Sequence, residues 1–119
     1  MDIYREEILD HFKNPRNYGE VKQATHKGMD RNASCGDLLE MSAIIEKGKV
    51  KIVKFKGEGC AVAMAAASML TEKIKGMSIT EIAKMTEAEI VKMLGINISS
   101  ARMKCATLGL VLCKKLIAK

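Results

Sequence analysis

The sequence predicts an α+β domain in which a small antiparallel β-meander of about three strands packs against several α-helices. Two segments, 38–45 and 49–56, are rich in apolar and β-branched residues and are joined by the short turn 46–48. After residue 60 the pattern changes to helical spacing and helix-capping motifs. Strands followed by helices are typical of the α+β class, and a chain of 119 residues suits a single domain, 1–119.

The first expected element is an amphipathic helix over residues 2–12. Tyr4, Ile8 and Phe12 recur there at helical spacing. Pro15 limits the helix, because the residue before a proline disfavours the helical conformation. The chain therefore enters the sheet through an irregular connection rather than through a continued helix.

The strands are predicted from alternation of apolar and polar residues. A short strand is expected near 24–31, and the two main strands are 38–45 and 49–56. In the last of these the alternation slips by one residue at Ile52-Val53. Such a slip indicates a β-bulge or a bend at that point.

Four helices are expected after the strands. Residues 61–75 are rich in Ala and Met and predict a largely buried helix that ends at Gly76. The shorter helices are marked by their end signals. These signals are the capping boxes 78–81 and 86–89, a stop at Gly95 and a cap at Ser99-Ser100.

Composition argues against two classes of function. The net charge is +6, which is compatible with binding to nucleic acid. Aromatic residues make up only 3%, however, so the side chains that stack on bases are scarce. A basic nucleic-acid-binding module is therefore the last-ranked alternative. No apolar run approaches the ~20 residues of a membrane span. The acidic start of the chain is unlike a signal peptide. We therefore expect a cytoplasmic protein that binds neither nucleic acid nor membranes, whose four cysteines are metal ligands, reactive thiols or core residues rather than disulfides.

The first two cysteines occupy positions that suit a site. Cys35 and Asp37 are two residues apart and point the same way in an extended segment, with Gly36 leaving room between them. A loop with one free thiol and a turn aspartate explains the same spacing equally well. Cys60 precedes the Ala-rich helix, where the helix dipole favours a thiolate. A small buried cysteine at a helix start is again an equal alternative.

The last two cysteines differ from each other. Cys105 is expected in about the first turn of the last helix, where the charges of Arg102 and Lys104 favour its thiolate. Lys104 is therefore a candidate for tuning this thiol, with an exposed lysine of no special role as the alternative. Cys113 lies among apolar residues in mid-helix and is predicted to be a core residue.

Spacing alone permits a shared site but does not require one. Cys35, Cys60 and Cys105 are separated by 25 and 45 residues, which matches no zinc-finger pattern. A loop between strands and two helix N-termini can nevertheless meet at one edge of a domain. His11 and His26 form no ligand-spaced pair; the helix dipole accounts for the first, and a loop or edge strand is expected for the second.

Four short segments, taken in order, form a recognisable pattern. They are Asn14-Pro15-Arg16-Asn17-Tyr18-Gly19, Asn32 to Asp37 with Cys35-Gly36-Asp37, Gly59-Cys60 with the Ala-rich run to Ser68 and Thr71-Glu72, and Arg102-Met103-Lys104-Cys105-Ala106-Thr107-Leu108. Each is a weak signal alone. Together they resemble the IscU/SufU family of iron–sulfur scaffolds, which is also called NifU N-terminal-like, and the resemblance runs from about residue 1 to 119.

The resemblance implies a scaffold that is not itself an enzyme. Cys35, Cys60 and Cys105 would accept sulfur and hold a transient [2Fe-2S] cluster, with Asp37 as a fourth ligand or as the group that makes the cluster labile. The implied partners are a cysteine desulfurase that donates sulfur as a persulfide and apo-proteins that receive the cluster. A homodimer in the cluster-bound state is also compatible with this pattern.

Three departures from the family pattern affect these expectations. Lys104 replaces the histidine usual before the third cysteine of IscU and is closer to the SufU branch, but the insertion typical of SufU between the second and third cysteines is lacking. The chaperone-recognition run of IscU has lost both prolines in residues 98–102, which argues against a dedicated Hsp70-type chaperone. The alternative function is a zinc-dependent sulfurtransferase of the SufU kind, because the same four side chains suit tetrahedral Zn²⁺.

Overall fold

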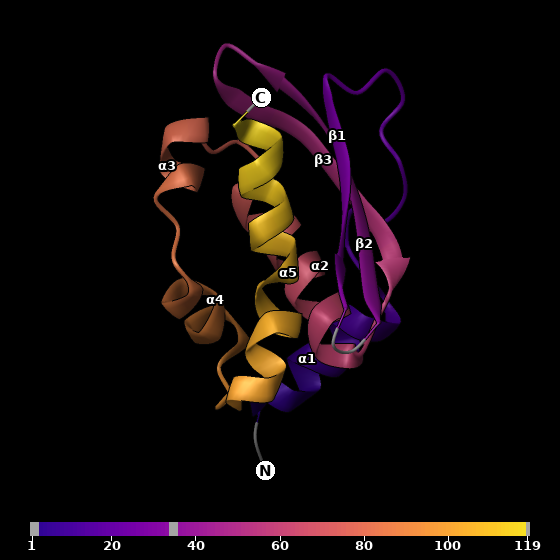
Figure 1. Ribbon diagram of the computed structural model, residues 1–119, viewed down its shortest axis with the longest axis vertical. Helices are drawn as coiled ribbons and strands as arrows, with labels where there is room; N and C mark the ends of the chain where they lie inside the picture. Colours follow the sequence, from indigo (N-terminus) through magenta and orange to yellow (C-terminus); the bar gives the residue numbers. More distant parts are fainter. Residues whose placement is uncertain (1–2, 34–35, 119) are drawn as a thin grey trace.

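The computed structural model describes residues 3–33 and 36–118. It contains a three-stranded antiparallel sheet with helices α2 and α5 packed on one face, which confirms the predicted α+β class (Figure 1). The N-terminal ends of α2 and α5 lie at the lower end of the molecule in that view, beside the start of β2. The elements are α1 (Ile3–Lys13), β1 (His26–Asn32), β2 (Asp37–Glu46), β3 (Lys49–Glu58), α2 (Ala61–Ile74), α3 (Ile79–Ala83), α4 (Glu87–Leu94) and α5 (Ser100–Ile117).

Helix α1 packs on α2, but through a different set of residues than its apolar spacing predicts. Ile8 is buried, whereas Leu9 and Phe12 remain more than 40% exposed (44% and 41%). His11 is buried instead, and its Nδ1 lies 2.7 Å from the hydroxyl of Ser68 on α2. The explanation of His11 by the helix dipole alone was therefore incomplete, because the imidazole joins two helices.

The sheet has the order β1-β2-β3, so the weakly predicted first strand is present as one edge. Strands β2 and β3 are joined at Lys47 and Gly48, which have φ angles of 52° and 75°. Two consecutive positive φ angles define the type I′ turn that suits a tight hairpin. The register shifts where Ile44 pairs with Ile52 but Ile45 pairs with Val50. The predicted bulge is confirmed, one residue earlier than the slip in alternation indicated.

Helix α2 is the central element of the molecule. It contacts α1, α4, α5 and β3, and its residues 63–71 are all buried. Small side chains permit this, because they let neighbouring backbones approach closely; a Cβ placed on Gly109 of α5 would lie 3.6 Å from the Cα of Ala67. Cys60, the residue that precedes α2, is thereby held in a fixed position relative to the rest of the core.

The shorter helices test the capping predictions. Ser78 and Glu81 form the full capping box at the start of α3. Thr86 precedes α4 but its side chain caps no backbone N–H, so the second predicted box is wrong. Gly95 ends α4 in the left-handed conformation, at φ 71°, and Ser99 caps α5 by accepting from the N–H of Arg102, both as predicted.

None of the helices in residues 3–33 and 36–118 combines the length and apolar character that a membrane span requires.

Candidate metal centre

Three segments that are far apart in sequence place metal-binding atoms together. Asp37 is the first residue of β2, Cys60 is the N-cap of α2, and Cys105 is in the second turn of α5. One oxygen of Asp37 and the two sulfurs all lie within 4.8 Å of one another. Within the described part of the chain, this is the only group of three such side chains close enough to hold one ion.

Asp37 is buried and its carboxylate faces the start of α2. Its Oδ1 accepts the backbone N–H of Cys60 at 3.1 Å, and its Oδ2 accepts the Cys60 thiol at 3.7 Å. The first N–H groups of a helix lack partners within the helix and carry partial positive charge. Because the Cys60 side chain makes no capping hydrogen bond, a carboxylate from the sheet satisfies one of these groups instead.

Gly59 provides the space for this carboxylate. A Cβ at residue 59 would lie 3.1 Å from Oδ1 of Asp37 and 3.4 Å from the Cβ of Ala63. Both separations are at the tight limit of normal contacts, so a side chain here would displace the carboxylate. The Gly-Cys pair at residues 59–60 thus has a steric cause: glycine admits Asp37, and the next residue presents its thiol to the carboxylate.

The two thiols differ in accessibility. Cys60 is partly exposed, whereas Cys105 is 3% exposed. The side-chain amide of Asn32 donates to the sulfur of Cys105 over 3.7 Å. Cys105 lies one turn deeper in its helix than its sequence position indicated, so the helix dipole acts on it less directly than expected.

Cys35 lies outside the described residues, and its predicted role as a ligand stays a prediction. The flanking residue Gly36 has φ +77°, a conformation that glycine adopts without strain. The Gly36 N–H donates to the carbonyl of Asn32 at 2.8 Å and closes the turn before Asp37. A Cβ at residue 36 would meet nothing within 4 Å among the described residues. The glycine between Cys35 and Asp37 is therefore explained by its positive φ angle and not by the room that the sequence analysis expected it to leave.

The two basic residues before Cys105 lie in different places. Arg102 lines the hollow of about 600 Å³ that contains Asp37, Cys60 and Cys105. Lys104 is exposed and lines another hollow, with Glu87 of α4. The hypothesis that Lys104 tunes Cys105 stays a prediction. Of the two cations that the sequence places near the Cys105 thiol, Arg102 is the one that lines the hollow with this thiol. Its position three residues before Cys105 on α5 puts it on the same side of the helix.

The remaining cysteine and the histidines lie away from this centre. Burial raises the pKa of the Cys113 thiol to about 11, as expected for a thiol in an apolar core. His11 contacts Ser68 and lies 3.7 Å from Glu72, and burial lowers its pKa, with the charge of Arg16 acting in the same direction. His26 begins the edge strand β1, as predicted.

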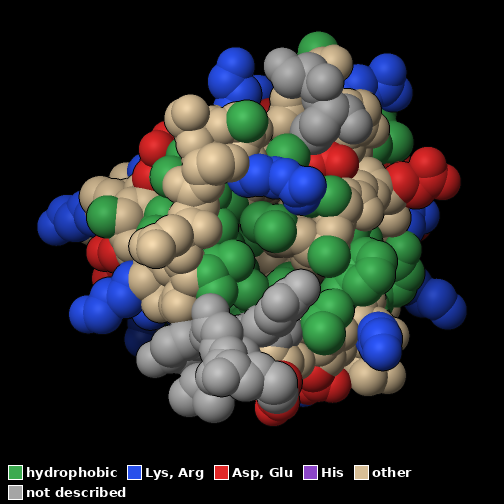
Figure 2. Space-filling model, turned by 90° about the horizontal axis from the view of Figure 1, so that it is seen from below, with side chains coloured by type: hydrophobic (Ala, Val, Ile, Leu, Met, Phe, Trp, Pro, Cys, Tyr) green, Lys and Arg blue, Asp and Glu red, His purple; other side chains and the backbone are tan. Residues whose placement is uncertain are grey.

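The face of the molecule that contains the metal centre is largely apolar in its middle part. Figure 2 views the lower end of the molecule and shows hydrophobic side chains over the centre of this face, with most charged side chains near its rim.

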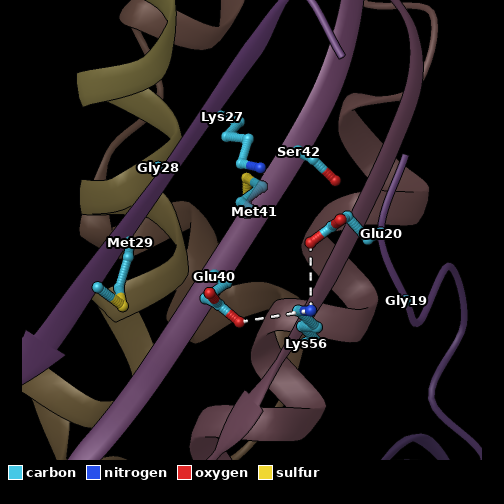
Figure 3. A pocket seen from close by; sticks show the side chains of 9 residues that line it. All are labelled: Gly19, Glu20, Lys27, Gly28, Met29, Glu40, Met41, Ser42 and Lys56. Atoms are coloured by element: carbon cyan, nitrogen blue, oxygen red, sulfur yellow. Dashed lines mark ion pairs between the residues drawn. The ribbon is translucent and has the colours of Figure 1, made fainter. Parts of the chain in front are cut away.

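A different hollow, of about 210 Å³, lies on the sheet, away from the metal centre (Figure 3). There Lys56 pairs with Glu20 at 3.1 Å and with Glu40 at 3.8 Å. Its lining contains no cysteine or histidine, so it offers no comparable set of donors.

The donor set determines which ions the centre suits. Thiolates favour iron in iron–sulfur clusters and Zn²⁺, and both species also accept a carboxylate oxygen. Two thiols and one carboxylate are already within reach of a single ion. The partial exposure of Cys60 leaves the centre open on one side, so an ion or a cluster can enter and leave there.

Comparison with known proteins identifies relatives along nearly the whole chain. The family model described as the NifU-like N terminal domain matches residues 3–119. The zinc-dependent sulfurtransferase SufU of Bacillus subtilis is 34% identical over 134 aligned positions, covering 98% of this chain and 90% of that protein. This alignment is longer than the chain, so that relative contains residues that this chain lacks. The iron–sulfur cluster assembly scaffold protein IscU of Aquifex aeolicus is 38% identical, with 90% of this chain and 69% of that protein covered.

Solved structures show the same fold. A putative iron–sulfur cluster assembly scaffold protein for the SUF system from Fervidobacterium islandicum superposes with a TM-score of 0.84 at 23% identity, covering 94% of both chains. The N-terminal part of a NifU-like protein from Brucella abortus gives a TM-score of 0.80 at 18% identity, covering 98% of this chain and 93% of that one. At these identities the likeness establishes the arrangement of strands and helices alone.

Proposed function

Since the chain belongs to the family of NifU-like N-terminal domains, we propose that it is a scaffold on which an iron–sulfur cluster is assembled and from which the cluster passes to apo-proteins. The relatives named as scaffolds and the donor chemistry of the centre support this proposal. The cluster is the cargo of the protein rather than a permanent cofactor. The scaffold itself needs only to hold the cluster, protect it and release it.

The observation that carries the proposal is the convergence of Asp37, Cys60 and Cys105 within 4.8 Å. These residues come from a strand, a helix cap and a helix interior, so no local motif brings them together. Cys35 is two residues before Asp37 in the chain and is the third thiolate that the resemblance implies. Three thiolates with one weaker oxygen ligand suit a cluster that must later leave.

The two oxygens of Asp37 have different partners in this scheme. Oδ1 accepts the Cys60 N–H, and Oδ2, which faces the Cys60 thiol, is the oxygen that would bind iron. Because the helix N-terminus shares the negative charge of the carboxylate, the bond from Asp37 to a cluster is weakened and easily exchanged. We therefore assign to Asp37 the role of making the bound cluster labile.

The proposed partners follow from the same chemistry. A cysteine desulfurase supplies sulfur, and apo-proteins accept the finished cluster. A second copy of the chain is a further candidate partner while the cluster is bound. The apolar middle of the face around the centre suits contact with other proteins (Figure 2).

The first experiment is isolation and reconstitution without oxygen. We expect iron and acid-labile sulfide in about equal amounts, with visible absorption from thiolate-bound iron. Cys35→Ser, Cys60→Ser and Cys105→Ser should each lose the coloured species, whereas Cys113→Ser, the matched control from the core, should keep it. A colourless protein after reconstitution, or equal loss in all four variants, would contradict the proposal.

A second experiment concerns Asp37. The variant Asp37→Ala should retain the cluster longer and transfer it more slowly to an apo-ferredoxin, because the exchangeable ligand is gone. Decay of the visible absorption, with and without the acceptor, measures both rates. Faster loss of the cluster than in the unmodified chain would show that Asp37 holds the cluster instead of releasing it.

A zinc-dependent sulfurtransferase is the second candidate. The observation that favours it is the match to SufU over 98% of this chain, together with a donor set that suits tetrahedral Zn²⁺. In that function a thiolate of this chain attacks the terminal sulfur of the desulfurase persulfide. The S–S bond of the donor breaks, the donor leaves as a thiolate, and a new persulfide forms on this chain without net oxidation or reduction.

Metal analysis and a sulfur assay separate the two functions. A scaffold binds iron and sulfide after isolation without oxygen, whereas a sulfurtransferase retains one Zn²⁺ and accepts labelled sulfur from a desulfurase in the absence of iron. Mass spectrometry of the chain after reaction with desulfurase and cysteine detects the added sulfur. Tight colourless zinc with efficient sulfur acceptance would establish the second function.

A further inference from the structure

Asn32 is a buried polar residue that lies beside two of the three donors. It is the last residue of β1 and pairs directly with Asp37 of β2 in the ladder. Its side chain is 8% exposed and reaches α5, where Nδ2 lies 3.7 Å from the sulfur of Cys105. One residue of the edge strand therefore connects the start of β2 with the helix that carries Cys105.

The side-chain amide of Asn32 is suited to contact a metal-bound sulfur. A buried carboxamide is costly without hydrogen bonds, and a sulfur is a weak acceptor as a thiol. A thiolate carries negative charge and accepts the same N–H more strongly. The contact is therefore more favourable when Cys105 binds a metal ion as a thiolate than when it is a protonated thiol.

The backbone of Asn32 is engaged at the same time. Its carbonyl accepts the N–H of Gly36 at 2.8 Å and closes the turn that leads to Asp37. The residue thus fixes the turn through its main chain and contacts Cys105 through its side chain. A substitution at Asn32 removes the contact with Cys105 but keeps the hydrogen bond from Gly36 to the backbone carbonyl of residue 32, so the two roles can be tested separately.

We propose that Asn32 is a positioning residue for Cys105: its amide holds the sulfur toward Asp37 and Cys60 and donates a hydrogen bond to that sulfur when a metal ion is bound. The inference rests on the proposed function in so far as the centre binds metal, and it holds for iron and for Zn²⁺ alike. Hydrogen bonds of this kind orient ligands, strengthen metal binding and lower the energy of the sulfur electrons.

Co²⁺ is the probe that tests this role without any activity assay. Thiolate-bound Co²⁺ has a sulfur-to-metal charge-transfer absorption in the near ultraviolet, whose energy reports on the sulfur. In Asn32→Leu, which has similar volume but no N–H donor, we expect binding of Co²⁺ weakened by about tenfold to a hundredfold. We also expect the charge-transfer band to move to lower energy, because the sulfur electrons are no longer stabilised by the N–H.

Two further variants complete the design. Asn32→Gln keeps a carboxamide and should restore part of the affinity and of the band position. Asn17→Asp is the matched control, because Asn17 donates from its Nδ2 to Thr71 at 3.2 Å and lies outside the centre; it should leave both readouts unchanged. If Asn32→Leu does not fold, as judged by circular dichroism, Asn32→Ala removes the same donor without adding volume.

The outcomes distinguish the inference from the function on which it rests. A donor-free Asn32 variant with unchanged affinity and band energy, even with a lower Tm, overturns the positioning role and leaves the proposed function intact. Absence of any thiolate-to-cobalt absorption in the unmodified chain overturns metal binding at this centre, and the positioning role with it. Weaker binding with a shifted band, partly restored by Asn32→Gln, supports the inference.

Discussion

Cys105 and Cys113 lie eight residues apart on α5, and each is 3% exposed. The sulfur of Cys105 receives an N–H from Asn32 and lies within 4.8 Å of donor atoms of two other residues. Cys113 packs in the apolar core, and burial raises the pKa of its thiol to about 11. Accessibility does not separate these two thiols. The polarity of the surroundings does: polar groups lie around the sulfur of Cys105, whereas apolar side chains surround Cys113, and this gives the two thiols of one helix different chemistry.

The largest expected difference between the two ends is in metal binding. Cys105→Ala removes a ligand and should weaken Co²⁺ binding by more than about a hundredfold. Cys113→Ala should keep the affinity and lower the free energy of unfolding by about 1 kcal/mol, through the small cavity that it creates. Absorption titration and chemical denaturation measure the two effects. Equal loss of binding in both variants would mean that burial, and not the polar surroundings, determines the role of each thiol.

The next effect is the pH dependence of stability that Cys113 causes. Its pKa is raised from 9.0 to about 11, so the folded state favours the neutral thiol. This stabilisation is complete below pH 9.0 and is lost as the pH rises toward about 11. Between about pH 8 and about pH 11, the free energy of unfolding of the unmodified chain should fall by about 2 kcal/mol more than that of Cys113→Ala. Parallel stability curves for the two chains would contradict the raised pKa.

A smaller effect is expected where Gly59 makes room for Asp37. In Gly59→Ala the new Cβ would lie 3.1 Å from the carboxylate, so Asp37 must move and Co²⁺ binding should weaken by about tenfold. Gly109→Ala is the control on the cysteine-bearing helix, since its Cβ would meet Leu70 at an ordinary 3.5 Å. Unchanged binding in Gly59→Ala would show that Asp37 does not need its present position.

The smallest effect concerns the basic residues near Cys105. Lys104 is exposed, and Lys104→Met should slow cluster formation by about twofold, the size expected for one screened charge. Arg102→Met should have the larger effect, because Arg102 lines the hollow of the centre. The growth of visible absorption during reconstitution gives both rates. An unchanged rate in Lys104→Met would rule out the hypothesis that this lysine tunes the thiol.

Most of the fold could be predicted because its signals are local. The type I′ turn at Lys47-Gly48, the stop at Gly95 and the cap at Ser99 each depend on the conformational preference of one or two residues. The predictions from sequence were wrong where tertiary packing determines which side chains are buried. Phe12 fits the apolar stripe of α1, yet it is 41% exposed because α1 instead packs on α2 through Ile8 and the buried His11.

The centre was less predictable because its geometry is non-local. The pattern of residues identified Asp37, Cys60 and Cys105 as candidates, but only the packing of α2 and α5 against the sheet brings them together. The role of Asn32 could not be recognised from spacing, since its partner Cys105 is 73 residues away. Cys35 lies outside the described residues, and its part in the centre stays a prediction.

The close contact between α2 and α5 has a consequence for metal preference. Gly109 and Ala67 face each other where the two cysteine-bearing helices cross. A Cβ at residue 109 would make only ordinary contacts, but side chains larger than alanine at either position would push the helices apart. The distance between the two sulfurs would then change without any alteration of a ligand. A selection for chains that prefer a larger or smaller ion should therefore start with graded substitutions at these two interior positions.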